Sequence, residues 1–249
     1  MEKIDPSGNS YDFSRFGLAE MTRCGIDLRR SGAGAASMEE VASRTVRYLY
    51  ETLRDPALDQ PACALVRMFV TLPFDELQPE LQSFSERILG RRPDPSMKCL
   101  TLLATAGDQP DWNSRHDSKG HQALPLPSPE AVSRSPMIAQ LIRQLGIEIS
   151  ALLSDSGLVI DATQHTFNVF YVGNAVGSAV IPAQQEFVIP YGVRSVLGFG
   201  GLLPSGELFA TILFSKTFIP REVADLFKTL ALNVKVALLP FVGARVFSE

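Results

Sequence analysis

The sequence predicts an α+β fold with a central antiparallel sheet of about five or six strands flanked by helices. Two runs rich in Val, Leu, Ile and Phe, at 193–202 and 207–216, are separated by Pro-Ser-Gly at 204–206, which is typical of a hairpin turn. A long helix is predicted after them, because Pro220 suits a first helical position and Glu222 adds an acidic side chain to the first turn.

Upstream of the hairpin, helical and strand patterns alternate. A helix is predicted from Ser37 to Arg54, because Ser37 and Glu40 have the spacing of a capping box, in which each side chain accepts a backbone hydrogen bond. The other predicted elements are strands at 63–72, 97–106 and 167–172 and helices at 76–90 and 136–145.

The segment from Gly107 to Pro136 has no regular pattern and is rich in proline, and it contains Trp112, His116 and His121. A structureless stretch of this length inside a compact domain is usually functional or disordered. We expect an ordered lid or a dimer-contact loop, with plain disorder as the alternative.

The block 190–239 resembles the C-terminal half of a GAF domain, a small-molecule sensing module of bacterial signalling proteins, which ends in a hairpin with a glycine turn and a helix rich in Leu and Ala. The resemblance implies a ligand cavity on one face of the sheet, covered by the stretch before the final hairpin. The domain boundaries that it implies are an N-terminal extension at 1–36, partly irregular or helical, a GAF-like domain at 37–241 with an insertion at 107–146, and a C-terminal tail at 242–249.

Composition limits the classes of partner. The net charge of −4 disfavours nucleic acid, because phosphate binding needs a basic surface. No apolar run approaches the roughly 20 residues that cross a bilayer, and the first ten residues lack the apolar core of a secretory signal. A cytoplasmic protein without a membrane partner is therefore expected.

Ligand-binding candidates are cations and aromatic residues on the predicted strands. Arg67 shares a face with Leu65 and Phe69 by strict alternation, and its guanidinium offers an anionic group a fixed fork of donors. A strand-edge bulge at Arg67, and a carboxylate partner for Arg194 at the sheet edge, are the alternatives. The candidates are Arg67, Phe69, Trp112, Tyr171, Tyr191, Arg194 and Phe199, whose aromatic members are also typical of a core.

The last helix is predicted to be apolar on two faces. One face, which should pack on the sheet, contains Val223, Leu226, Phe227, Leu230, Val234 and Leu238. The opposite face contains Leu232, Val236 and Leu239. We expect this second face to be a homodimer interface, as the GAF resemblance implies, and its alternative partner is residues 1–54 of the same chain.

Catalytic motifs are missing from the sequence. It contains no P-loop, no dinucleotide fingerprint, no H-E-x-x-H and no C-x-x-C, and its three histidines are too scattered to predict a metal site. The methionine sulfoxide reductases among GAF-fold proteins use three clustered cysteines, whereas Cys24, Cys63 and Cys99 are widely spaced. Cyclic-nucleotide and bilin signatures are also missing, so no cofactor is identified and no enzymatic activity is expected.

These observations predict a cytoplasmic sensory or regulatory module that binds a small ligand and signals through helix-mediated dimerisation. The output partner, such as a histidine kinase, would be a separate protein or a missing part of this one. A ligand-free dimerisation module is the alternative, and a GAF-fold enzyme is a third class.

Overall fold

An antiparallel sheet with the order β6-β5-β4-β9-β8-β7 forms the centre of the molecule. The computed structural model describes residues 10–154 and 168–248. The predicted α+β class with five or six strands is confirmed. The six strands are β4 (Cys63–Pro73), β5 (Lys98–Gly107), β6 (Ala123–Pro125), β7 (Val169–Val172), β8 (Ser195–Leu202) and β9 (Leu208–Ser215).

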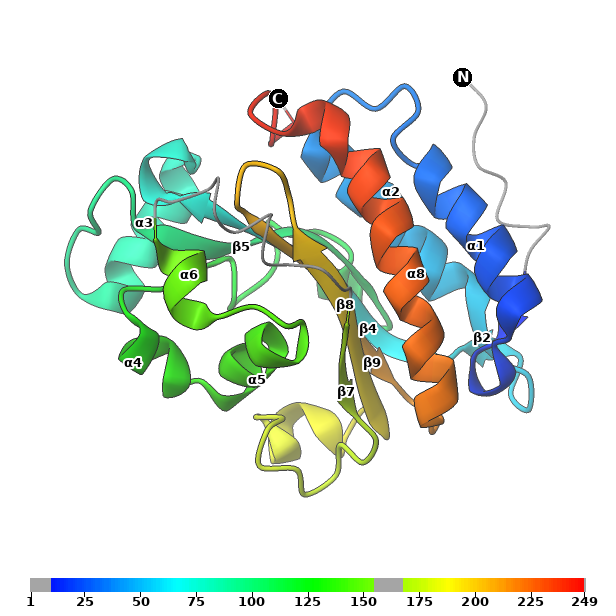
Figure 1. Cartoon of the computed structure of the whole chain (residues 1–249). Helices are drawn as coiled ribbons and strands as arrows, with labels where there is room; N and C mark the ends of the chain where they lie inside the picture. The colour runs from blue at the N-terminus through cyan, green and yellow to red at the C-terminus, as the bar shows by residue number, and fades with distance from the viewer. Residues whose placement is uncertain (1–9, 155–167, 249) are drawn as a thin grey trace.

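Helices cover both faces of this sheet (Figure 1). The face that we call the α8 face packs against α1 (Leu18–Arg30), α2 (Met38–Thr52) and α8 (Arg221–Leu238). The opposite face, called the α5 face, lies under α4 (Pro129–Ser133), α5 (Pro136–Gln144), α6 (Ile149–Leu153) and the segment 175–193. Helix α3 (Pro79–Leu89) packs beside β6.

Alternation along β4 divides the core between these two faces. Val66 and Met68 pack into the α8 core, whereas Leu65 and Phe69 pack into the α5 core. This is the period-two pattern expected for a strand with both faces buried. The predicted face-sharing of Leu65, Arg67 and Phe69 follows from the same alternation.

The C-terminal hairpin and helix form as predicted. The turn is closed by a hydrogen bond from Leu203 N to Glu207 O of 2.8 Å, and Gly206 has a φ of +91°, which favours glycine. Pro220 is the N-cap of α8 and not its first helical residue, so the helix begins at Arg221, one residue later than predicted. The predicted sheet-facing stripe of α8 is buried, except for Leu226, which is half-buried.

The described part of the N-terminal extension packs closely on α8. The rings of Phe16 and Phe227 are 5.2 Å apart, a Cβ on Gly25 would lie 2.8 Å from the Asn233 amide, and one on Gly32 would lie 2.6 Å from Ala237 O. In these three contacts the residue numbers rise in both segments, from Phe16 with Phe227 to Gly32 with Ala237, so α1 and α8 run parallel (Figure 1). The small sheet β1 (Tyr11–Asp12), β2 (Leu53–Asp55) and β3 (Gln60–Pro61) ties this extension to the end of α2.

The insertion at 107–146 is ordered and supplies an edge strand. It contains a 3-10 turn at Pro110–Trp112, then β6, α4 and α5. Strand β6 pairs with residues 99–101 of β5, and Leu102 N donates to Gln122 O at 2.8 Å. Beyond residue 102, the outer edge of β5 lies beside loop 113–122 instead of a paired strand.

Residues 242–248, which we call the C-terminal strap, cap the start of α2. Met38 N donates to Arg245 O at 3.0 Å and Glu39 N donates to Val246 O at 2.8 Å. The predicted capping box is only half correct. Ser37 Oγ accepts from Glu40 N, but the Glu40 carboxylate accepts from Ala36 N at 2.7 Å and not from the backbone N–H of Ser37.

Candidate functional site

Arg67 is the central residue of a polar row on the α5 face. It lies on β4 opposite Thr105 of β5 and Ile212 of β9. On either side along β4, Leu65 and Phe69 are buried in the apolar core of the same face. The sequence therefore places a guanidinium and a hydroxyl next to each other within an apolar surface.

The Arg67 guanidinium has no hydrogen-bond or ion-pair partner among residues 10–154 and 168–248. Its Nε is fully enclosed and unpaired, and so is the Oγ1 of Thr105, a residue that is only 5% exposed. Burial lowers the pKa of Arg67 to about 10, so the side chain still carries its charge at neutral pH. A buried charge without a partner is costly, and such groups usually pair with an anion.

His121 is a titratable residue whose pKa the charge of Arg67 affects. Desolvation and then the positive charge of Arg67 lower the pKa of His121. His121 has a left-handed φ of +64° and immediately precedes Gln122, which bonds to the outer side of β5. His121 therefore lies within electrostatic range of Arg67, at the outer side of β5. We call Arg67, Thr105 and His121 the edge site.

A hollow of about 190 Å³ adjoins the edge site. It lies between α2 and the loop 113–116, at the unpaired outer edge of β5, and Thr105 is one of the residues that line it. Most of the other lining side chains are polar, and Arg47 and His116 are among them. Arg67 does not line the hollow, because α2 bounds the hollow from the α8 face whereas Arg67 lies on the α5 face.

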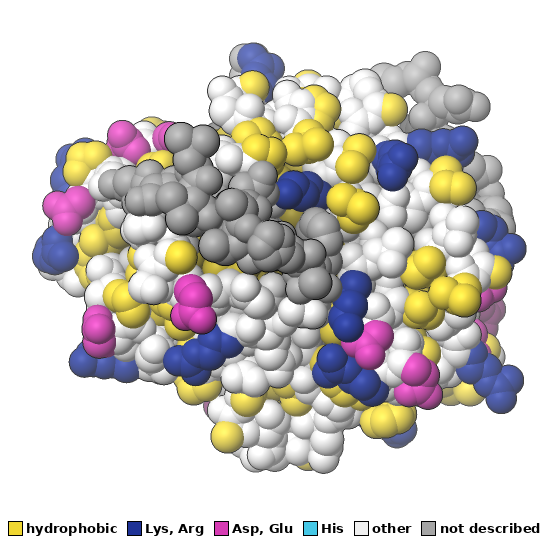
Figure 2. Space-filling model, viewed as in Figure 1, with side chains coloured by type: hydrophobic (Ala, Val, Ile, Leu, Met, Phe, Trp, Pro, Cys, Tyr) yellow, Lys and Arg dark blue, Asp and Glu magenta, His cyan; other side chains and the backbone are white. Residues whose placement is uncertain are grey.

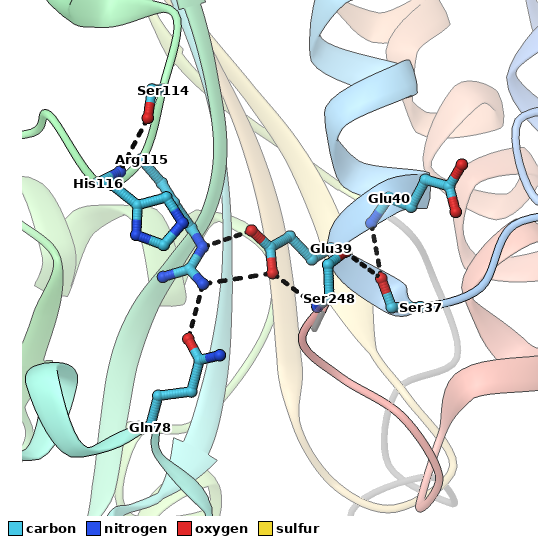
Figure 3. A network of polar contacts seen from close by, with 8 residues as sticks. All are labelled: Ser37, Glu39, Glu40, Gln78, Ser114, Arg115, His116 and Ser248. Carbon is cyan, nitrogen blue, oxygen red and sulfur yellow. Dashed lines mark hydrogen bonds and ion pairs between the residues drawn. The ribbon is translucent and has the colours of Figure 1, made fainter.

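One wall of the hollow is fixed by an ion-pair network (Figure 3). Arg115 donates from Nε to Glu39 Oε1 at 2.6 Å and from Nη2 to Gln78 Oε1 at 2.6 Å. Glu39 also accepts from Ser248 N at 2.9 Å, and the Arg115 guanidinium lies 5.2 Å from the centre of the Phe247 ring. Figure 3 shows Arg115 of the insertion, Glu39 of α2, Gln78 at the start of α3 and Ser248 of the strap converging. The charges of Arg115 and Glu39 compensate each other, so this network holds the wall in place and is not itself a candidate for binding a ligand.

An aromatic cluster holds the start of the insertion against the segment 175–193. The Trp112 ring lies 4.6 Å from Tyr191 and 5.6 Å from Phe187, and Phe187 contacts Phe214 of β9 at 5.0 Å. Phe187 belongs to a π-helix at Gln184–Val188, a rare conformation that is frequent at functional sites. Trp112 lies beside Leu65, near the start of β4. Leu65 precedes Arg67 by two residues in that strand.

The seven predicted ligand-binding residues do not share one site. Arg67, Phe69, Trp112 and Tyr191 lie on the α5 face, as a common cavity requires. Phe199 instead packs on the α8 face, with its ring 5.5 Å from Phe227, so it belongs to the core under the helix. Tyr171 points to the same face, where its hydroxyl donates to Ile219 O.

Arg194 lies in a separate surface hollow of about 420 Å³, near the start of α8. Its side chain is exposed, and the hollow also contains Lys216 and Thr217. Lys216 is paired with Asp108 at 2.9 Å. This position separates Arg194 from the edge site, because Arg194 precedes β8 whereas Arg67 is in the middle of β4.

Sequence reasoning missed Thr105, His121 and Arg115. The register of β4 with β5 places Thr105 opposite Arg67. The residue pattern of a single strand does not predict its register with a neighbour, so this pairing could not be predicted. Arg115 and His121 were part of a segment without a pattern. A buried cation in a polar, proline-rich loop leaves no periodic signal.

The cysteines do not form a reactive cluster. Cys24, Cys63 and Cys99 are buried in α1, β4 and β5, and burial raises the pKa of each thiol, that of Cys99 to about 11. No group of three potential metal-ligating side chains occurs in the part of the chain that the structure describes.

The outer face of α8 is not covered by the described residues of the chain. Leu232 is 45% exposed and Leu239 is 40% exposed, and Val236 between them is half-buried. The described residues of 1–54, which were the alternative partner, pack on a different face of α8, through Gly25 and Gly32. In the view of Figure 2, hydrophobic side chains form several separate patches with Lys and Arg between them. None of the described helices combines the length and the apolar character that spanning a membrane requires.

The chain is similar in structure to solved GAF domains over about nine-tenths of its length. A GAF domain from a phosphoenolpyruvate-protein phosphotransferase of Coxiella burnetii is 10% identical, with a TM-score of 0.46, and the match covers 90% of this chain and 92% of that one. The phycoerythrobilin-bound GAF domain of a cyanobacterial phytochrome is 10% identical, with a TM-score of 0.43, and coverage is 88% and 92%. No protein-family model and no curated protein matches the sequence.

Proposed function

We propose that this protein is a cytoplasmic sensory or regulatory module that binds a small ligand at the edge site and signals through a homodimer formed by α8. The observation that carries the ligand proposal is the Arg67 guanidinium, which is charged, half-buried and unpaired among the described residues. A structural arginine in such a place normally has a carboxylate partner, like the Glu39 partner of Arg115.

The surroundings of Arg67 also suit a binding site. Thr105 adds a second enclosed and unpaired polar atom beside Arg67. A hollow bounded by α2 opens at the same edge of β5, and the ion pair of Arg115 and Glu39 keeps its wall in place. Small-molecule sites typically combine a concave surface with a few convergent polar groups.

The dimer part of the proposal comes from α8. Its exposed stripe of Leu232, Val236 and Leu239 lies at helical spacing on one face, and association would remove this apolar surface from water. A ligand beside α2 would change the packing of the helical layer through Glu39 and the C-terminal strap, which follows α8 directly. The output partner, for example a histidine kinase, belongs to the same proposal.

Two alternatives differ from this proposal in what they require. A ligand-free interaction module would keep the α8 dimer and leave the edge site empty. A thiol-based enzyme would need a cysteine with a lowered pKa, and burial instead raises the pKa of all three thiols. We therefore propose a non-enzymatic role.

Native mass spectrometry of protein purified gently from its host tests both halves of the proposal. We expect a dimer that carries a released small molecule at near-stoichiometric occupancy, and a strongly reduced occupancy in Arg67→Met. An empty wild-type dimer would favour the interaction module. An empty monomer would contradict the ligand and the dimer together.

A further inference from the structure

We infer that the hollow around Arg194 is a second binding site, which takes an α-amino acid with an apolar side chain. This is the hollow of about 420 Å³ near the start of α8, and we call it the Arg194 hollow. The inference goes beyond the proposed function, because it depends neither on Arg67 nor on the α8 dimer. It follows from two opposite charges that line this space without pairing and from two exposed apolar side chains beside them.

The Arg194 hollow lies between two parts of the chain that the fold brings together. One wall is the turn between β2 and β3, at residues 55–60. The other wall is the end of the main sheet, where Arg194 precedes β8 and residues 216–218 follow β9. Lys216 N donates to Ala62 O at 2.7 Å, and this main-chain bond ties the two walls together. The space therefore has a frame of backbone on both sides.

Arg194 and Asp55 carry opposite charges on the two walls, and they do not form an ion pair with each other or with any other described residue. The other charged side chain of the hollow, Lys216, is paired with Asp108 at 2.9 Å. Asp55 Oδ1 accepts a hydrogen bond from Ala57 N at 2.9 Å, which leaves its second oxygen available. The hollow thus offers one partner for an anionic group and another for a cationic group.

Two apolar side chains add a different kind of surface to the same hollow. Leu58 is 66% exposed and Phe218 is 57% exposed, and both line the Arg194 hollow. Exposed apolar side chains that gather on a concave surface often mark a ligand site. An apolar group of a ligand placed against them would remove their surface from water.

These groups together favour an α-amino acid. The guanidinium of Arg194 matches a carboxylate, and Asp55 accepts hydrogen bonds from an ammonium group. Pro220, the N-cap of α8, lines the same hollow, so the positive end of the helix dipole also favours the carboxylate. A simple carboxylate or a phosphate would leave Asp55 without a partner, and a simple amine would leave Arg194 without one. A zwitterion satisfies both, and the apolar walls favour one with an apolar side chain.

Nuclear magnetic resonance of the backbone amides at 55–60 and 216–218 tests this inference. Protein labelled with nitrogen-15 is titrated with L-leucine and with three analogues that each lack one group. Isocaproate lacks the ammonium group, isoamylamine lacks the carboxylate, and glycine lacks the apolar side chain. We expect L-leucine to shift these amide resonances in a saturable manner and each analogue to bind at least about tenfold more weakly.

Two variants test the charges separately. Arg194→Met and Asp55→Asn should each lower the affinity for L-leucine about tenfold. Asn at position 55 keeps an oxygen for the bond from Ala57 N, and this variant should bind isocaproate no more weakly than the wild type does, which shows that its hollow is intact. Arg134→Met and Asp94→Asn, at exposed positions outside the hollow, are the matched controls and should bind L-leucine as the wild type does.

The other outcomes would overturn the inference. Equal affinities for isocaproate and L-leucine, or an unchanged affinity in Asp55→Asn, would contradict a zwitterionic ligand. Equal affinities for glycine and L-leucine would contradict the role of the two apolar side chains. If L-leucine shifts only resonances elsewhere, or none in a saturable manner, the Arg194 hollow is not its site. The proposed function is judged separately, by the ligand on protein from the host and its loss in Arg67→Met.

Discussion

Arg115 and Glu39 form an ion pair in which the two side chains are only 5% and 12% exposed, with 2.6 Å between Nε and Oε1. The pair joins the insertion to the first turn of α2, 76 residues away in the sequence. Gln78 and Ser248 complete the hydrogen bonding, so neither charge is left uncompensated. The insertion is therefore an integral part of the domain and not an appendage.

Breaking this pair should destabilise the protein strongly. Arg115→Leu leaves the Glu39 carboxylate buried without its cation, and removing one partner of a buried pair typically costs about 3–5 kcal/mol. Urea unfolding measures the loss. Arg23→Leu, which removes an exposed pair with Glu20 on α1, is the control and should cost less than about 1 kcal/mol. Equal effects of the two variants would contradict a supporting role for Arg115.

Gly107 should be intolerant of a side chain. A Cβ at this position would lie 2.8 Å from Ala64 O and 2.9 Å from the Trp112 ring. Gly107→Ala should therefore displace the indole and cost about 1–3 kcal/mol. Because Trp112 is the single tryptophan of the chain, its fluorescence reports the displacement as a red shift of the emission.

Gly120→Ala is the matched control for Gly107→Ala, since a Cβ at Gly120 meets no atom within 4 Å. Its emission spectrum and stability should match the wild type. If Gly107→Ala gave the same spectrum as this control, the close packing of Trp112 on the end of β5 would be wrong.

The three thiols should be unreactive in the folded protein. Cys24, Cys63 and Cys99 are buried with raised pKa values, so a thiol reagent such as Ellman's should modify them only after unfolding. Rapid modification of any one under native conditions would revive the thiol-enzyme alternative.

The raised pKa values of the three thiols also determine whether the free energy of unfolding rises or falls with pH. The unfolded chain loses its thiol protons near the ordinary pKa of about 8.5, before the folded chain does. The contribution of the thiols to stability is therefore complete below that pH and is lost as pH rises toward the folded pKa, about 11 for Cys99. Urea unfolding at rising alkaline pH measures this loss.

Charges on the outer stripe of α8 should abolish the proposed dimer. Leu232→Glu combined with Leu239→Glu places two carboxylates at positions that are already exposed, so folding should change by no more than about 0.5 kcal/mol per site. Analytical ultracentrifugation should then show a monomer. Leu58→Glu, at a 66% exposed position between β2 and β3, should remain dimeric.

Long apolar runs made much of the sheet predictable. Strands β4, β5, β8 and β9 are continuous hydrophobic segments with clear turns, and their positions agree with the prediction within one or two residues. Strand β6 was missed because Ala123–Pro125 is three residues long and lies among prolines. Its pairing with β5 is decided by the tertiary structure and not by local propensity.

The candidate site was predictable only in part. Alternation placed Arg67 with Phe69, because a single strand fixes which of its residues share a face. It did not assign Phe199, since the face toward which β8 turns that ring depends on its register with β9. The contact between Trp112 and Tyr191 joins segments far apart in the sequence, and the residue pattern of neither segment predicts this contact.

The way the C-terminal strap caps α2 affects how the chain tolerates change. Met38 and Glu39 donate to the main-chain carbonyls of residues 245 and 246, and every amino acid has such a carbonyl. Evolutionary drift in the identity of those two positions would leave these two bonds intact. The loss or gain of one residue between Leu238 and Arg245 would move both carbonyls away from the helix. Chain length should therefore be preserved there more strictly than composition.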